Sequence, residues 1–347
     1  MATANYSGLS GQAYWAERAM EVQDNIYKDV KKTDKLLADQ YKTALDEIQA
    51  SLSLFYTKYA EENKVSYTEA MKQMDAYDIS NYGNRMNQLK QRALATNNPF
   101  VIAEMEKLFQ VGKVARFQAL MAQIDAQLVL LGYEQQISME EALTGVYESA
   151  YYQTAFTIQK ATGVGVALAA INPSYVQEAL TFPWSGDQFS ERIWSNRTKL
   201  VNEMRQTITQ GMIQGHSVQK MSRELSGKMD SSYKNSLRLI RTETAYVATE
   251  ATAKNYQSVG LAQYIFIGTL DSKTSKLCQD LDGKVFNLED KQVGKNCVPM
   301  HPNCRSAIAP YFSPEDLGER RARDIDGNNF IVPNMTYHEW AAIYLKK

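Results

Sequence analysis

The sequence contains little cysteine or histidine, and its charges nearly cancel. Lys and Arg total 38 and Asp and Glu total 39, which gives a formal net charge of −1 at pH 7. A nearly neutral chain offers no overall electrostatic attraction to nucleic acid or to a membrane surface. Three cysteines in 347 residues are too few for a disulfide framework in a protein of this size, so we expect a protein made in a reducing cytoplasm.

Segments that would direct the chain to a membrane are missing as well. The most apolar run, at residues 163–171, is far shorter than the roughly 20 residues that a membrane-spanning helix needs. The first residues lack the basic and apolar regions of a signal peptide. We therefore expect no membrane segment.

Proline is scarce over most of the chain. None occurs before Pro99, and only Pro99, Pro173 and Pro183 precede Pro299. Because proline interrupts helices, its scarcity favours long ones. Over residues 15–59, apolar side chains recur in steps of three, four and four, a period that keeps one apolar stripe nearly straight along a helix. Such a stripe must be covered, so we expect partner helices beside it.

Helical patterning continues through most of the first 260 residues. Asn98-Pro99 predicts a turn, Gly132 predicts a helix end, and Ser138, three residues before Glu141, predicts a new helix start with a capping box. Loops are expected at residues 172–174 and 183–186. The remaining expected helices cover residues 67–94, 100–131, 138–156, 190–211, 217–227 and 232–258.

The pattern changes to short strands after Gly260. Residues 263–269, 284–286 and 306–309 have the composition of strands, and Asp282-Gly283 marks a turn. A last helix is expected to begin at residue 336.

These elements predict a mainly α fold with a small α+β C-terminal subdomain, in which long extended helices pack as an elongated bundle. The expected domains are residues 1–260, with breaks near 97–99 and 172–186, and residues 261–347.

All three cysteines and one of the three histidines lie in this C-terminal part, as Cys278, Cys297, His301 and Cys304. Three thiolates and one imidazole suit a tetrahedral Zn²⁺ site, and four protein ligands would leave no open position, so the metal would be structural. The alternative is metal-free, with Cys278 an ordinary buried thiol and residues 301–304 a hydrogen-bonded turn. The sequence leaves both interpretations open.

Signatures of enzymes are mostly missing from the sequence. His338-Glu339 lacks the second histidine of the H-E-x-x-H motif, and neither a Walker loop nor a G-x-S-x-G elbow occurs. Asp280 and Asp282 could be read as paired carboxylates. With Gly283 beside them, a β-turn is favoured.

Arg241 and Glu243 are the remaining pair with catalytic potential. They lie two residues apart on a predicted helix and so do not share a face, which favours structural contacts made separately by each side chain. One side chain is expected to anchor the C-terminal part and the other to meet a neighbouring helix. The functional alternative is a catalytic Arg and Glu, as in ADP-ribosyl transfer.

Several short motifs follow one another in a fixed order, namely R-T-E-T at 241–244, D-S-K-T-S-K-L-C at 271–278, L-D-G-K-V-F at 281–286, P-M-H-P-N-C-R at 299–305 and Y-H-E-W at 337–340. In this order they resemble the Mu F-like head morphogenesis family of tailed phages. The match spans about residues 238–340. Relatives often have a second cysteine where Ser306 stands and a proline where Val298 stands, so the zinc site is not carried over from the family.

The resemblance implies a non-enzymatic minor component of the phage head, acting in head morphogenesis and in genome packaging or delivery. It implies a place in the virion, in the head interior or at the portal vertex, after assembly in the host cytoplasm. The expected partners are portal and capsid proteins, with packaged DNA as a further contact and no small-molecule substrate. The alternative function is that of an enzyme, either ADP-ribosyltransferase-like or a zinc-dependent hydrolase.

Overall fold

The computed structural model describes residues 11–60, 64–162, 171–311, 319–323, 328–333 and 335–344, with the backbone alone at 160–162, 319–321 and 333. Most of the apolar run at 163–171 lies outside the described residues. Among the helices of the described part, none combines the length and the apolar character that crossing a membrane requires.

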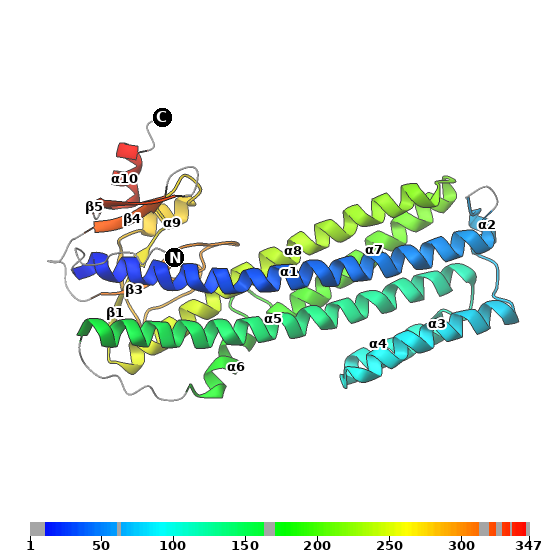
Figure 1. Cartoon of the computed structure of the whole chain (residues 1–347), viewed down its shortest axis with the longest axis horizontal. Helices are drawn as coiled ribbons and strands as arrows, with labels where there is room; N and C mark the ends of the chain where they lie inside the picture. The colour runs from blue at the N-terminus through cyan, green and yellow to red at the C-terminus, as the bar shows by residue number, and fades with distance from the viewer. Residues whose placement is uncertain are drawn as a thin grey trace. The chain divides into compact units, whose positions relative to one another are not determined.

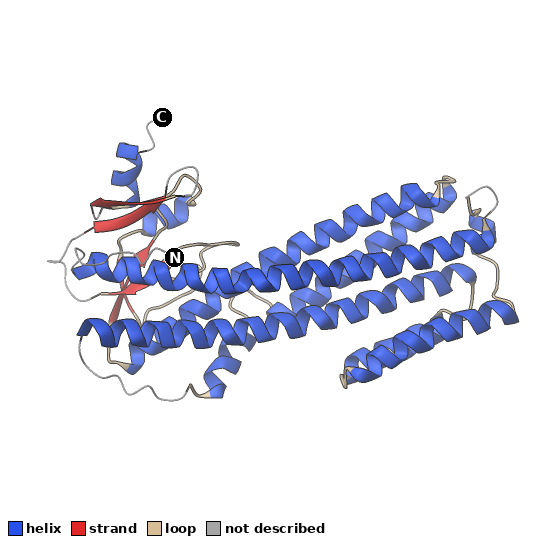
Figure 2. Cartoon of the chain, in the orientation of Figure 1, coloured by secondary structure: helices blue, strands red, loops and turns tan. Residues whose placement is uncertain are grey.

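Helices make up most of the described residues, and a few short antiparallel strands come late in the chain (Figure 2), which confirms the predicted mainly α fold with strands near the C-terminus. The helices are α1 (Gly11–Tyr59), α2 (Tyr67–Ala70), α3 (Ala76–Ala95), α4 (Pro99–Val111), α5 (Arg116–Thr162), α6 (Pro173–Thr181), α7 (Phe189–Ile213), α8 (Val218–Ser258), α9 (Lys276–Leu281) and α10 (Tyr337–Tyr344). The strands are β1 (Gln263–Ile267), β2 (Val285–Asn287), β3 (Ala307–Pro310), β4 (Glu319–Arg323) and β5 (Asn329–Pro333).

The described residues form two compact units, each assembled from separate stretches of chain. The first unit draws on Met1–Lys32, Glu140–Phe189 and Arg238–Lys347, and the second on Thr33–Met139 and Ser190–Leu237. Helices α1, α5 and α8 each supply a segment to both units (Figure 1). The domain boundary at residue 260 stays a prediction.

The apolar stripe predicted along residues 15–59 is confirmed within the second unit. Tyr41, Ala44, Ile48, Leu52 and Phe55 are buried at the predicted positions on α1. They pack in one cluster with buried side chains of α5, α7 and α8. These helices therefore cover the stripe. Fully burying one large apolar side chain stabilises the folded state by about 1.5–3 kcal/mol.

The break between α4 and α5 corrects the predicted helix at residues 100–131. The phenol of Tyr82 lies against Gly112, where a Cβ atom would overlap the hydroxyl. This hydroxyl also donates a hydrogen bond to the Leu108 carbonyl in the last turn of α4 (2.8 Å). The helix stops at Val111, and α5 begins at Arg116.

The helix end predicted at Gly132 and the helix start predicted at Ser138 are also wrong, because α5 runs through both. A Cβ atom at Gly132 would lie 3.1 Å from the Trp194 ring, so this glycine provides close helix packing instead of a stop. The Ser138 hydroxyl donates to the Glu134 carbonyl (2.8 Å) and accepts a hydrogen bond from Gln40 (2.8 Å). It bonds as a mid-helix serine, not as a cap.

Two further boundaries differ from the sequence-based expectation. The helices expected at 217–227 and 232–258 are one continuous helix, α8. Asn172-Pro173, expected to mark a loop, begins α6: the Asn172 side chain accepts a hydrogen bond from the Ser174 N–H (3.0 Å), and Pro173 occupies the first turn.

The first unit is built around a three-stranded antiparallel sheet with the order β2-β1-β3. Tyr264 of β1 lies opposite Phe286 on β2 and opposite Pro310 on β3. Residues 264–267 and all of β3 are buried, so both faces of this part of the sheet are covered. The buried cluster around it includes side chains of α1, α8 and α9.

A second sheet pairs β4 with β5 and has no counterpart among the predicted elements. The last helix, α10, begins after Thr336 as predicted, and the Thr336 N–H donates a hydrogen bond to the Glu339 carboxylate (2.7 Å). Trp340 of α10 is 1% exposed and packs with Leu270 and the β4–β5 sheet.

Asp78 at the start of α3 provides a test of how the second unit is held together. Its buried carboxylate accepts hydrogen bonds from Lys58, Tyr59 and Arg116, the last at 3.0 Å. Burial alone would raise the pKa of Asp78, but these bonds outweigh it and lower the pKa from 3.8 to about 2. A lowered pKa means that the stabilisation is present above pH 3.8 and is lost as the pH falls through about 2.

We expect Asp78→Asn to lower the free energy of unfolding at pH 7 by on the order of 3 kcal/mol, because two cations lose their buried partner. Denaturant titration measures the loss. The exposed Asp39 of α1 is the matched control, and Asp39→Asn should change stability by less than about 0.5 kcal/mol. Equal effects of the two substitutions would contradict this role of Asp78.

Candidate functional site

The family-like motifs of the first unit meet where α8 contacts the loop at residues 298–306. Thr242, in the R-T-E segment of α8, is buried and accepts a hydrogen bond from the Asn303 N–H (3.0 Å). Asn303 has a positive φ of 58°, a conformation that asparagine adopts more readily than most residues. The bond joins two motifs that lie 61 residues apart in the sequence.

Arg305 and Asp271 join this loop to the turn after β1. Both guanidinium nitrogens of Arg305 donate to the Asp271 carboxylate, at 2.5 and 3.0 Å. The same carboxylate accepts from the Lys273 N–H and the Thr274 hydroxyl, each at 2.9 Å. Burial would raise the pKa of Asp271, but the Arg305 contacts prevail and lower it. The aspartate-led turn is therefore a structural junction.

The L-D-G-K motif also closes a turn. Asp282 is buried, and its carboxylate accepts a hydrogen bond from the Gly268 N–H (2.7 Å), while Gly283 has a positive φ of 77°. Asp280 is exposed and lies 3.1 Å from His338. The predicted β-turn is confirmed, because the Lys284 N–H donates a hydrogen bond to the Leu281 carbonyl (3.0 Å), and the two carboxylates contact different partners.

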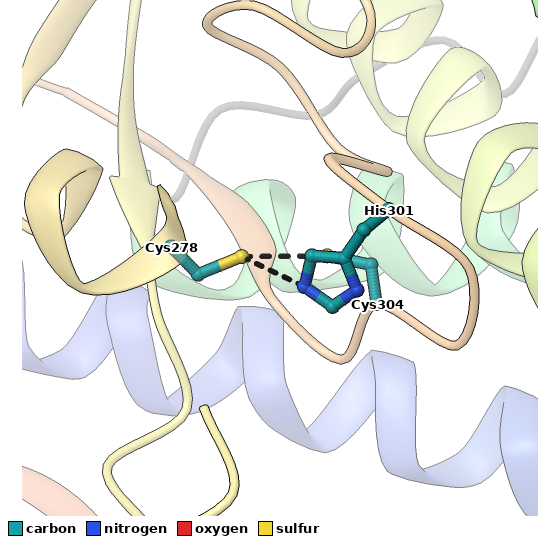
Figure 3. Close-up of side chains that lie close together, drawn as sticks. All are labelled: Cys278, His301 and Cys304. Atoms are coloured by element: carbon teal, nitrogen blue, oxygen red, sulfur yellow. Dashed lines mark hydrogen bonds between the residues drawn. The ribbon is translucent and has the colours of Figure 1, made fainter. Parts of the chain in front are cut away.

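Cys278, His301 and Cys304 come together in the first unit. Figure 3 shows the Cys278 sulfur reaching from α9 toward His301 and Cys304, which lie on the loop before β3. The Cys278 sulfur lies 3.7 Å from the Cys304 sulfur and 3.4 Å from His301 Nε2. The ligand atoms of all three side chains lie within 4.8 Å of one another. Both cysteines are buried and His301 is half-buried.

The surroundings of Cys304 favour its thiolate form. The hydrogen bond with Cys278 lowers the pKa of the Cys304 thiol, helped by His301 and by the backbone N–H groups of Met300 and Ser306. The same bond and burial raise the pKa of Cys278. The hydrogen bond to Cys304 also raises the pKa of His301. The pair thus shares one proton, with the negative charge on Cys304.

Cys297, the fourth predicted ligand, is not in this group. It is fully buried, its thiol contacts Tyr264, and burial raises the pKa of the thiol to about 12. Its backbone N–H donates to the Gln292 carbonyl (3.2 Å), which holds it in the turn at residues 292–297. The structure therefore brings together three of the four predicted ligands, and the Tyr264 contact holds Cys297 elsewhere in the core.

Arg241 and Glu243 diverge on α8, as their spacing predicts. Arg241 is exposed and lines a cavity of about 350 Å³ that also borders on Tyr27 and Arg305. Glu243 is 5% exposed and instead accepts a hydrogen bond from the Trp184 indole (3.0 Å). The two side chains do not line a common cavity among those seen in the described residues.

Sequence reasoning missed two residues that position the loop. Tyr27 of α1 donates a hydrogen bond to the Cys304 carbonyl (2.9 Å), and no local pattern pairs residues 277 positions apart. The second residue is Thr242, because the sequence drew attention to its charged neighbours Arg241 and Glu243 instead. No local sequence signal identifies it, because the N–H that its hydroxyl accepts from lies 61 residues away in the sequence.

Comparison with known proteins finds a family that this part of the chain matches. Residues 202–309 match the family of Phage Mu protein F like proteins. The chain carries a Mu F-like region. It extends from α7 to β3, so it begins earlier than the resemblance suggested, and it ends before the Y-H-E-W element of α10.

Two relatives show how far the likeness extends. The minor head protein GP7 of Bacillus phage SPP1 is 24% identical over 332 residues, which cover 91% of this chain and 93% of that protein. The NAD(+)–arginine ADP-ribosyltransferase EFV of Enterococcus faecalis is 26% identical over 148 residues, or 42% of this chain and 30% of the transferase. The chain thus spans less than a third of that enzyme. No solved structure shows a significant match.

The bond between Thr242 and Asn303 gives a direct test of how the Mu F-like region is held. We expect Thr242→Val to lower the free energy of unfolding by about 0.5–1.5 kcal/mol, because the partly buried Asn303 N–H loses its acceptor. Thr249→Val is the matched control: the Thr249 hydroxyl, like that of Thr242, donates to the carbonyl four residues earlier (2.7 Å). Denaturant titrations that show the same loss for both variants would rule out a special role for Thr242.

Proposed function

We propose that this protein is a structural minor component of a tailed-phage head that acts in head morphogenesis. The observation that carries the proposal is the alignment with the minor head protein GP7, which runs over nearly the full length of both chains. The likeness includes the helices outside residues 202–309 as well as the Mu F-like region. A shared role of the whole protein is the simplest account of such a match.

The contacts of the motif residues support a structural role. Thr242, Asp271, Asp282 and Arg305 bond to backbone groups or to one another. Catalytic groups need to reach a substrate in a common cavity, whereas these side chains connect segments of the fold.

We further propose that the protein associates with the portal vertex or the inner face of the shell, and contributes to genome packaging or delivery. Portal and capsid proteins are the proposed partners. Contact with DNA would come from local basic groups, because the net charge of the chain is close to zero. Such contact would show as salt-sensitive retention on DNA.

The proposed location can be tested with the tagged full-length chain in cells producing the phage. We expect the portal protein to co-purify with it even when the major capsid protein is absent. We also expect the chain in purified heads, in far fewer copies than the major capsid protein by quantitative mass spectrometry. Purified tails provide the control fraction. If the chain were found in tails, or were absent from every particle fraction, the proposal that it is a head component would be contradicted.

The partial similarity to an ADP-ribosyltransferase identifies one enzymatic alternative that can be assayed directly. We expect the purified protein, incubated with labelled NAD⁺ and a guanidino acceptor, to give no transfer above the level of Glu243→Gln. This substitution keeps an oxygen acceptor for the Trp184 indole and removes the Glu243 carboxylate, the group that would act in ADP-ribosyl transfer. Transfer by the unmodified chain that Glu243→Gln abolishes would establish the enzyme instead.

A further inference from the structure

The spacing of Cys278, His301 and Cys304 matches the ligand shell of a metal ion. Zinc–sulfur bonds of about 2.3 Å at the tetrahedral angle place two sulfurs about 3.8 Å apart. A sulfur and an imidazole nitrogen bound at about 2.0–2.1 Å are then about 3.6 Å apart. The corresponding distances here are 3.7 Å between sulfurs and 3.4 Å from Cys278 to His301 Nε2. These two distances are close to those expected around zinc, and the third pair, the Cys304 sulfur and a ring nitrogen of His301, lies within 4.8 Å.

The imidazole of His301 is oriented for metal binding by the backbone. Its Nδ1 lies 2.9 Å from the Pro302 carbonyl, which can only accept, so Nδ1 carries the proton and donates it. The neutral ring then presents the lone pair of Nε2 toward Cys278. Ligating histidines commonly have this second hydrogen bond to a carbonyl or carboxylate, which fixes the tautomer and the ring plane.

The sulfurs also have the hydrogen-bond donors that a bound thiolate needs. Backbone N–H groups of Met300 and Ser306 lie near the Cys304 sulfur, and the hydroxyls of Ser275 and Ser306 lie near the Cys278 sulfur. Both cysteines are almost completely buried, at 1% and 0% exposure. Several donors directed at two buried sulfurs stabilise negative charge at a site where an isolated thiolate would be costly.

We propose that Cys278 Sγ, Cys304 Sγ and His301 Nε2 bind one Zn²⁺ ion, with a water molecule as the fourth ligand. Two thiolates and an imidazole favour zinc over the oxygen-seeking Mg²⁺ and Ca²⁺. Solvent reaches the group on the side of His301, which is half-buried, and Cys297 is not available because it packs against Tyr264. The site differs in this way from the sealed four-ligand site that the spacing of the motifs predicts.

The ion would connect α9 to the loop at residues 298–306. Cys278 lies 23 residues before His301 and 26 residues before Cys304, so one ion replaces a long-range contact that the small sheet cannot supply by itself. Binding releases the one proton that Cys278 and Cys304 share to solvent. The site is independent of the proposed role in the phage head, since a protein in any location could use it for stability.

Metal content of the full-length protein, purified under reducing conditions and exposed to one equivalent of Zn²⁺, tests the proposal. We expect about one zinc per chain by elemental analysis. Cys278→Ser and Cys304→Ser should each lower retention at least tenfold, as should His301→Ala. Cys297→Ser is the matched control, a substitution of an equally buried cysteine that should keep the metal.

Each other outcome overturns the proposal. A folded chain that retains no zinc means that the group is a metal-free turn. Loss of zinc in a folded Cys297→Ser variant means that four protein ligands are used. A mass two hydrogens lower, with Cys278 and Cys304 linked after mild oxidation and no zinc uptake once reduced, means a redox pair, which would have to close the sulfurs from 3.7 Å to about 2.05 Å.

Cobalt substitution and hydrogen exchange keep the test meaningful if a cysteine variant unfolds. Co²⁺ added to the unmodified chain should give the intense visible absorption of a four-coordinate thiolate site, and added imidazole should shift it by displacing the water. Removal of zinc by a chelator should speed amide exchange in α9 and at residues 298–306 more than in α3. Unchanged exchange, or a six-coordinate cobalt spectrum, would contradict the site.

Discussion

The hydrogen bond from the Asn303 backbone to the Thr242 hydroxyl determines where the loop at residues 298–306 lies. Asn303 lies between His301 and Cys304 in the sequence. Because its N–H is bonded to α8, the directions of the His301 and Cys304 side chains are fixed as well. Tyr27 holds the Cys304 carbonyl from α1, and Arg305 fastens the next residue to the Asp271 turn. The loop has no regular secondary structure, and these polar contacts with buried partners provide its order.

This arrangement explains why the family-like motifs lie so far apart in the sequence. R-T-E supplies an acceptor on a helix, D-S-K-T supplies a carboxylate turn, and H-P-N-C-R supplies the loop that both of them hold. Glu243 belongs to the same helix but contacts Trp184, and Trp184 stacks on Tyr246 with ring centroids 5.4 Å apart. Motif residues thus connect segments of one structural unit, which fits a protein that contributes shape and contacts to a particle.

Much of the fold follows from the sequence where local signals agree with packing. The apolar period of three, four and four residues predicted the buried face of α1, and residue composition predicted β1, β2 and β3. Local signals failed where a distant side chain decided the outcome. Gly132 looks like a helix end until Trp194 is packed against it, and the space beside Gly112 is occupied by the distant Tyr82.

The candidate site shows the same limit. The ligand types and most of the positions are visible in the sequence, because Cys278, His301 and Cys304 stand in short motifs of clear chemistry. Whether Cys297 belongs to the ligand group is not visible in the sequence, because that depends on how Tyr264 of β1 packs against it. Thr242 was also hidden, because its importance comes from a backbone N–H that only the folded loop brings to it.

Native-state amide hydrogen exchange at Asn303 in the full-length protein tests the central claim most directly. If α8 holds the loop, the Asn303 amide should exchange as slowly as that of Gly268, which donates to the buried Asp282 carboxylate. An Asn303 amide that exchanges at the rate of an exposed loop would show that the loop is not anchored there, and the account of the Mu F-like region given by these contacts would be wrong.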